Sequence, residues 1–307
     1  MQSENLFKRK ALTESGVAYS LGIVIYVVFS LVYSVAAQLI WGAGYADNAL
    51  YRYLVYLLPQ LCFAAAAFVF FRRSKTSVRS VYRPCKARYF FLAVLMQFGL
   101  LFSLSELNTL FLDWLQSVGY QMPQSHLPPL DGWNLLPAII VIAILPAIFE
   151  ETLFRGILVT RMRASGWGTV ATVFISGALF SLYHGNPAQT IYQLICGVCF
   201  ALLTLRAGSV LPSSVAHFCN NAAILALTST GYEVAGGWTM PPSWRLGLLI
   251  SASVLFVGTL IYLVFDGAHR QKGGVKDGKF FFAGAAVGII VCAVLWIANL
   301  VTGFIGG

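Results

Sequence analysis

The sequence predicts an all-α, polytopic membrane protein, and two observations support this fold class. Of its 307 residues, 58% are hydrophobic and only 10% are charged, whereas soluble domains contain about 25% charged residues. Apolar stretches of the length that crosses a bilayer as a helix, about 20 residues, follow one another along the chain. A soluble domain of this length could not bury so much apolar surface, so we expect an integral, multi-pass membrane protein.

The apolar stretches predict about nine transmembrane helices. They are expected at residues 17–41, 50–71, 89–112, 135–159, 167–183, 188–205, 209–229, 244–265 and 280–304. The fifth and sixth are short and are joined only by residues 184–187, so eight crossings with one re-entrant segment is the alternative count. The first is longer than the apolar core of a signal peptide, about 7 to 15 residues, and is expected to be an uncleaved anchor.

The net charge of +9 is distributed as a membrane topology predicts. With a cytoplasmic N-terminus and nine crossings, 17 of the 20 lysines and arginines lie in cytoplasmic segments, as the positive-inside rule requires. Arg52 and Arg245 fall outside, and Arg155 lies within a helix. Topology and anionic lipid account for the charge, so we expect the lipid bilayer, in a bacterial cell membrane, as the environment and no nucleic acid as a partner.

Ionisable groups at membrane depth divide the chain into three parts. Residues 1–134 hold three helices and their connectors, residues 135–229 hold four central helices, and residues 230–307 hold two C-terminal helices. A charge inside a bilayer costs about 3 kcal/mol or more and by default indicates function. Such charges gather in the central part, which is therefore the expected catalytic core.

Three of these charges lie on one predicted helix. Glu151 and Arg155 are spaced i, i+4, so they are expected to form an ion pair along one face. Glu150 points about 100° away from Glu151 and is left free to face a cavity between helices. A purely architectural network of two acids and one base is the alternative.

Two histidines complete the polar set. His184 ends the fifth predicted helix, and His217 and Asn221 lie at i, i+4 in the seventh. One glutamate and two histidines can activate water, either as a general base with polarising partners or as zinc ligands, in which case Glu150, His184 and His217 would hold the metal. If each helix spans the membrane, His184 falls near the outer end, whereas Glu150 and His217 lie about 10 Å from the cytoplasmic face. A shared site therefore requires the fifth helix to be tilted or sunk.

Four other polar residues are given no catalytic role. Glu106 and Asp113 lie near the outer end of the third predicted helix and are expected at the membrane interface. His126 and His269 lie in connectors.

These residues form three motifs that resemble a known family. The motifs are Glu-Glu-x-x-x-Arg at 150–155, Phe-x-x-x-His at 180–184 and His-x-x-x-Asn at 217–221. In this order and on separate helices they are similar to the signatures of the CAAX protease and bacteriocin-processing family of intramembrane proteases, which includes the type II CAAX prenyl endopeptidases. The resemblance covers roughly residues 135–225.

The resemblance implies a role for each motif residue. Glu150 would activate water together with His184, while His217 and Asn221 would stabilise the oxyanion. Glu151 and Arg155 would brace the site. The implied activity is cleavage of a membrane-associated or lipidated peptide or protein. No cofactor is certain, and the absence of a His-Glu-x-x-His helix leaves zinc open.

Two other functions remain as alternatives. A proton- or ion-coupled transporter also places charges within helices, but the inverted repeat common in transporters is absent from the sequence. A non-catalytic immunity or scaffold relative would keep the fold without the activity. The substrate, its cleavage site and the oligomeric state are left open by the sequence.

Overall fold

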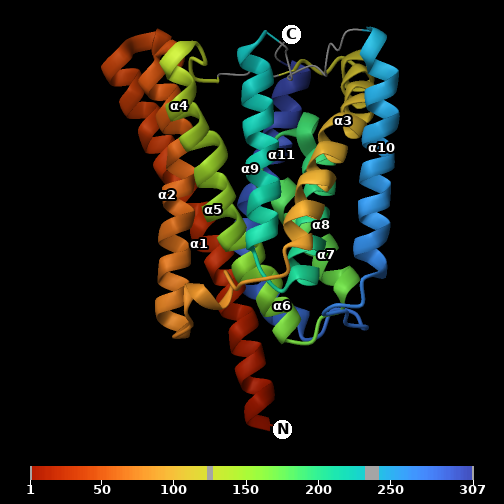
Figure 1. Ribbon diagram of the computed structural model, residues 1–307. Helices are drawn as coiled ribbons and strands as arrows, with labels where there is room; N and C mark the ends of the chain where they lie inside the picture. Colours follow the sequence, from red (N-terminus) through yellow and green to blue (C-terminus); the bar gives the residue numbers. More distant parts are fainter. Residues whose placement is uncertain (1, 123–126, 232–241, 306–307) are drawn as a thin grey trace.

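The computed structural model describes residues 2–122, 127–231 and 242–305, so His126 lies outside the described residues. Over these residues the chain forms a bundle of long helices. The N-terminus and the C-terminus of the chain lie at opposite ends of this bundle (Figure 1). The helices that run uninterrupted are α1 (Gln2–Trp41), α2 (Ala49–Ser74), α3 (Arg88–Ser117), α7 (Thr169–Tyr183), α8 (Thr190–Ala207), α9 (Leu211–Ser229), α10 (Pro242–Phe265) and α11 (Gly278–Ile305). Four short 3-10 turns, η1 (Gly42–Asp47), η2 (Val78–Ser80), η3 (Gly132–Asn134) and η6 (Pro187–Gln189), lie in the connections.

The predicted fold class is confirmed. In the described part of the chain, seven helices are long and apolar enough to cross a membrane. The shorter apolar helix α7 and the more polar α9 make up the rest of the bundle. Large apolar side chains such as Phe68, Val254 and Ile290 are exposed, as expected for helices that face lipid. The count of nine crossings stays a prediction.

The helix predicted at 135–159 is longer and less regular than expected. It runs as α4 (Leu135–Ala138), η4 (Ile139–Ile144), α5 (Leu145–Glu151), η5 (Thr152–Val159) and α6 (Thr160–Ala164), where η4 and η5 are π-helical. The wider π turns leave carbonyl groups that need other donors. Asn221 Nδ2 donates to Ile142 O, a carbonyl of η4, at 2.7 Å. A side chain from α9 therefore stabilises the irregular turn that precedes Glu150.

Helix α7 has only 15 residues, and its length explains the depth of His184. At 1.5 Å per residue it spans about 22 Å, less than the roughly 30 Å of a bilayer's hydrocarbon core. The turn after it is held by α11, where Asn299 Nδ2 donates to Gly185 O at 2.8 Å and Trp296 Nε1 donates to Thr190 Oγ1 at 2.8 Å. His184 thus ends a helix that stops inside the bundle.

Helices from both chain ends pack around the central part. Helix α1 packs along α11 and α2, α7 packs along α8, and α3 packs along α9 and α10. The contact between α1 and α11 depends on small residues, because a Cβ added at Gly288 would lie 2.9 Å from Ser20 Cα. The closely packed terminal helices therefore support the core that contains the site.

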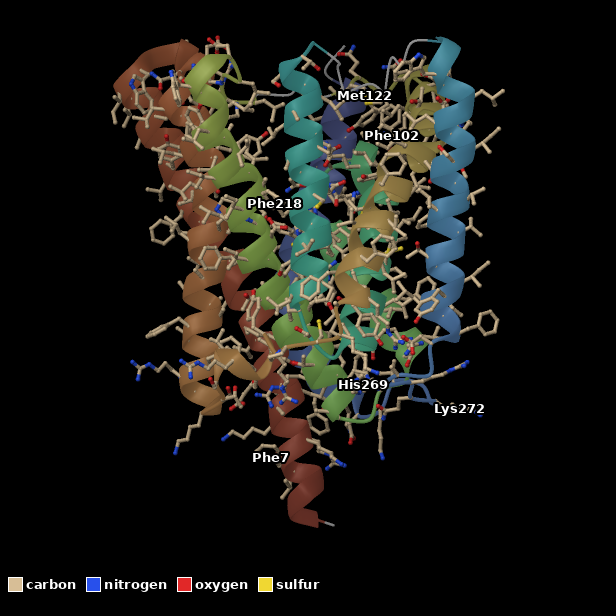
Figure 2. The ribbon with its side chains drawn as sticks, in the orientation of Figure 1. Phe7, Phe102, Met122, Phe218, His269 and Lys272 are labelled. Carbon is tan, nitrogen blue, oxygen red and sulfur yellow. The ribbon has the colours of Figure 1, made fainter. Side chains whose placement is uncertain are left out.

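The basic segments meet at one end of the bundle. Arg161 of α6 donates to Thr76 Oγ1 at 3.2 Å, and Arg88 Nη2 lies 3.3 Å from Asp266 Oδ2. Figure 2 places Phe7, His269 and Lys272 at this same end, which we call the basic end. At the opposite end Arg245 Nε donates to Glu106 Oε1 at 2.7 Å. At the same end Arg52 Nη2 lies 2.6 Å from Asp47 Oδ1. Both of these arginines are thus paired with an acid.

Candidate active site

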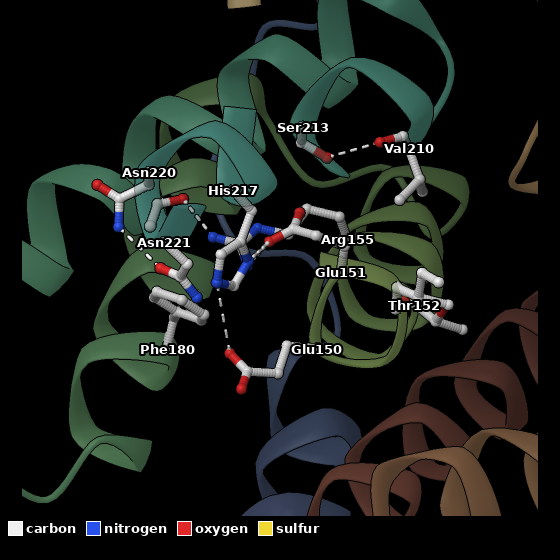
Figure 3. A network of polar contacts seen from close by, with 12 residues as sticks. Glu150, Glu151, Thr152, Arg155, Phe180, Val210, Ser213, His217, Asn220 and Asn221 are labelled. Atoms are coloured by element: carbon white, nitrogen blue, oxygen red, sulfur yellow. Dashed lines mark hydrogen bonds and ion pairs between the residues drawn. The ribbon is translucent and has the colours of Figure 1, made fainter. Parts of the chain in front are cut away.

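Glu150 lies at the end of α5 with 4% of its surface exposed. Its Oε1 accepts hydrogen bonds from Gln60 Nε2 at 2.9 Å and from Tyr183 OH at 3.5 Å. Its Oε2 is buried without a hydrogen-bond partner, and the nearest cationic candidate is His217 Nε2 at 4.0 Å (Figure 3). One oxygen of this carboxylate is therefore held in place, and the other has unused acceptor capacity.

Glu151 forms the ion pair that its spacing predicts. Arg155 Nη1 lies 2.8 Å from Glu151 Oε1, and both side chains are fully buried. The guanidinium lies over the ring of Phe180 at 4.3 Å and of Phe200 at 5.4 Å, and it donates to Gly197 O at 3.3 Å. A buried charge is tolerated when it is paired and hydrogen-bonded, so this pair is an internally neutral brace between α5–η5 and helices α7 and α8.

His217 of α9 bridges the two glutamates (Figure 3). Its Nδ1 lies 3.0 Å from Glu151 Oε1, and its Nε2 faces Glu150 Oε2 at 4.0 Å. An ionised carboxylate only accepts hydrogen bonds, so Nδ1 is the donor to Glu151. The Nε2 atom then carries a proton only when the ring is an imidazolium. The ring lies between the carboxylates of Glu150 and Glu151.

His184 reaches the same site despite its place at the end of α7. Its ring packs against Phe180 at 4.6 Å, and the ring of His217 packs against the same phenylalanine at 5.9 Å. The adjacent Tyr183 donates to Glu150 Oε1, so this end of α7 lies beside Glu150. His184 Nδ1 lies 2.8 Å from Phe180 O; since a carbonyl only accepts, Nδ1 is the donor and Nε2 has the free lone pair. The short helix α7 thus brings His184 to the depth of Glu150 and His217, where a full-length helix would not.

Asn221 lies on α9 beside His217, but its amide is engaged elsewhere. Its Nδ2 donates to Ile142 O, and its Oδ1 accepts from Asn220 Nδ2 at 2.9 Å. Asn220 in turn accepts from Gln97 Nε2 at 2.6 Å and from Tyr192 OH at 2.7 Å. A role of Asn221 as an oxyanion donor requires it to exchange the bond with the π-helical carbonyl.

Two residues around Glu150 were missed by the sequence analysis. Gln60 comes from α2, outside the motif region, and is 97% buried. Tyr183 directly precedes the motif histidine. The available signal for Gln60 was its polarity, since it follows Pro59 within an otherwise apolar stretch.

The predicted zinc ligands do not form a metal set in this arrangement. Within the described residues, no three His, Cys, Asp or Glu side chains are placed to hold a metal ion. Zinc binding by Glu150, His184 and His217 stays a prediction.

The fold brings a carboxylate and two histidines from three different helices together inside a bundle of long apolar helices. Such groups can activate water for hydrolysis. Residues 132–223 match the family model described as type II CAAX prenyl endopeptidase Rce1-like. This match confirms the resemblance to the CAAX protease family that the motifs indicated.

The matched segment contains all six predicted site residues and does not reach Gln60. No curated protein and no solved structure matches the chain significantly.

Proposed function

We propose that the chain is an endopeptidase that hydrolyses a peptide bond of a membrane-associated or lipidated peptide or protein. The observation that carries this proposal is the buried Oε2 atom of Glu150, which has no partner and faces His217 inside the bundle. An unpaired buried carboxylate oxygen is costly, and a water molecule that it activates would explain why it is kept. The family of the matched segment supports a protease.

Water activation is assigned to Glu150 and His184. A water bound to Glu150 Oε2 would attack the carbonyl carbon of the scissile peptide bond, and its proton would pass to Glu150 or to His184 Nε2. Besides Glu150 Oε2, the Oε1 atom of Gln60 is also a buried acceptor without a hydrogen-bond partner. This atom belongs to the amide that donates to Glu150 Oε1, so it is well placed to orient the same water.

The oxyanion is assigned to His217 and Asn221. In the tetrahedral intermediate the former carbonyl oxygen is negative, and the imidazolium Nε2–H of His217 would donate to it. Glu151 would hold the Nδ1–H side of this ring, and Arg155 would balance the charge of Glu151. When the C–N bond breaks, the proton taken up by Glu150 or His184 would pass to the leaving amine nitrogen.

The substrate is expected to enter from the bilayer or its surface, because the site lies among helices that face lipid. A comparison of membrane peptides in cells with the wild-type protein and with Glu150→Gln tests activity and identifies candidate substrates together. We expect one or more cleavage products to disappear and their uncut precursors to accumulate in the variant. Identical peptide profiles at equal protein abundance would contradict the proposal.

Purified protein separates the protease from its alternatives. We expect reconstituted wild-type protein to cleave a substrate found in cells and His184→Ala to lose this cleavage. A non-catalytic relative would cleave nothing, and a transporter would instead produce ion flux in the same liposomes. The metal content of this sample tests the zinc hypothesis independently.

A further inference from the structure

A second site lies at the basic end of the bundle, apart from the catalytic residues. An open cavity of about 540 Å³ is lined by the end of α2 and the loop after it, the η5–α6 segment, the end of α8 with the turn to α9, and the connector after α10. None of the six predicted catalytic and supporting residues lines it. Its walls are partly apolar, formed by Phe70, Phe71, Val81, Val159 and Val210. A ligand for this cavity must therefore offer an apolar part.

Three arginines give the cavity a positive charge, namely Arg83, Arg161 and Arg163. Arg161 stacks on Phe70 at 5.2 Å and donates to Thr76 Oγ1. Arg163 Nη1 donates to Gln271 Oε1 at 2.6 Å. These contacts fix the guanidinium groups of Arg161 and Arg163 through uncharged partners, so they orient the charge without neutralising it.

The lack of acidic partners sets these arginines apart from their neighbours. At the same end of the bundle Arg9 pairs with Asp277 at 3.4 Å and Arg88 pairs with Asp266. Among the described residues, no carboxylate forms an ion pair with Arg83, Arg161 or Arg163. An arginine is always charged. The carboxylate of Glu14 acts on Arg161 without forming an ion pair with it, and it lies 3.8 Å from Lys10 Nζ. The cavity therefore keeps a net positive charge that an external anion can balance.

We propose that this cavity binds the phosphate headgroup of an anionic phospholipid. Arginine matches phosphate through paired hydrogen bonds, and basic pockets between helices at the membrane surface are suited to such headgroups. The aromatic and aliphatic wall would contact the glycerol and the start of the acyl chains. A free phosphate shares the headgroup chemistry but has nothing to place against this wall, which is why we assign the lipid.

The test removes charge from the cavity and, in a control, from exposed positions at the same end of the bundle. Arg83→Ala/Arg161→Ala removes two lining charges, and Arg73→Ala/Arg79→Ala removes two exposed charges that do not line the cavity. Phosphatidylglycerol binding to each purified protein in neutral detergent is measured by native mass spectrometry. Each lining arginine is expected to contribute about fivefold, so the first pair weakens binding about 25-fold and the control less than twofold.

Equal loss in both pairs, or no loss in the first, would overturn the proposal. The single variant Arg83→Ala guards against misfolding, because this side chain is exposed, and it is expected to weaken binding about fivefold. Inorganic phosphate is the second probe, and we expect it not to displace phosphatidylglycerol at equal concentration. Displacement would overturn the assignment to a lipid, since the cavity would then recognise phosphate alone.

Discussion

At the residue scale, the two adjacent glutamates differ in what they contact. Glu151 Oε1 contacts the charged Arg155 and His217, whereas Glu150 Oε1 accepts only from the uncharged Gln60 and Tyr183. The second oxygen of each glutamate is buried without a hydrogen-bond partner, and that of Glu150 faces His217 Nε2 at 4.0 Å. A single step along the helix turns one side chain toward the arginine and the other toward the opposite wall of the site. The same residue type therefore serves as a brace in one position and as the proposed base in the next.

Arg155→Leu tests the brace. We expect it to destabilise the protein by about 3 to 5 kcal/mol, because the buried charge of Glu151 loses its partner. The double variant Glu151→Gln/Arg155→Leu should recover much of this stability, since no uncompensated charge remains, but it should not recover cleavage. Thermal unfolding in detergent and a cleavage assay measure the two effects. A double variant as unstable as the single one would show that the pair does not act as a neutral unit.

Gln60→Leu tests the residue that the motifs missed. It removes the hydrogen bond to Glu150 Oε1 and the free acceptor beside it. A hydrogen bond to a charged group contributes about 1.5 to 3 kcal/mol, so we expect kcat to fall about 10- to 100-fold with KM little changed. Gln38→Leu, an exposed position on α1, is the matched control. Equal kcat values in the two variants would remove Gln60 from the site.

At the scale of elements, the site depends on irregular and short helices. The π segments η4 and η5 flank Glu150 and Glu151, and α7 ends inside the bundle at His184. Helices α7 and α8 then pack so closely that a Cβ added at Gly197 would lie 2.7 Å from Gly177 Cα. Since Gly197 O also accepts from Arg155, this contact connects helix packing with the brace of the site.

Gly197→Ala tests the close packing of α7 and α8. The added methyl group forces the helices apart, so we expect a loss of about 1 to 3 kcal/mol of stability and a lower cleavage rate. The matched control is Gly258→Ala on α10, where a Cβ meets nothing within 4 Å. Thermal unfolding and cleavage are measured for both. A Gly197→Ala protein that behaves like the control would contradict the packing argument.

Much of this site could be predicted from the sequence, and the misses have physical causes. The i, i+4 spacing correctly predicted the Glu151–Arg155 pair, because that contact is local to one helix. The depth of His184 could not be predicted from the sequence because it depends on where α7 ends. A tertiary contact, the hydrogen bond from Asn299 of α11 to Gly185 O, fixes the turn at that end. Gln60 was missed because its contact with Glu150 joins segments 90 positions apart.

At the scale of the whole molecule, charge is segregated between the two ends of the bundle. The basic end gathers arginines and lysines from five segments of the chain, while Arg52 and Arg245 at the other end pair with acids. Such segregation is the signature of orientation in a membrane. We propose that the basic end, with the N-terminus, faces the cytoplasm.

Two cysteine substitutions test this orientation. Lys272→Cys lies at the basic end (Figure 2) and Trp133→Cys, at a position 90% exposed, lies at the other. We expect an impermeant thiol reagent to label Trp133→Cys in intact cells and Lys272→Cys only after the membrane is opened. The unsubstituted protein gives the background from the native cysteines. The reverse labelling pattern would place the N-terminus outside.

The central claim is that Glu150 activates the water that cleaves the substrate. Its most direct test is the cleavage rate of purified Glu150→Gln, which keeps the size and one acceptor of the side chain but cannot take up a proton. General base catalysis contributes about 10²- to 10⁴-fold, so we expect the rate to fall by at least 100-fold with unchanged thermal stability. Glu106→Gln, which alters a membrane-helix carboxylate outside the site, should cleave at the wild-type rate. A Glu150→Gln protein that cleaves as fast as Glu106→Gln would contradict the account.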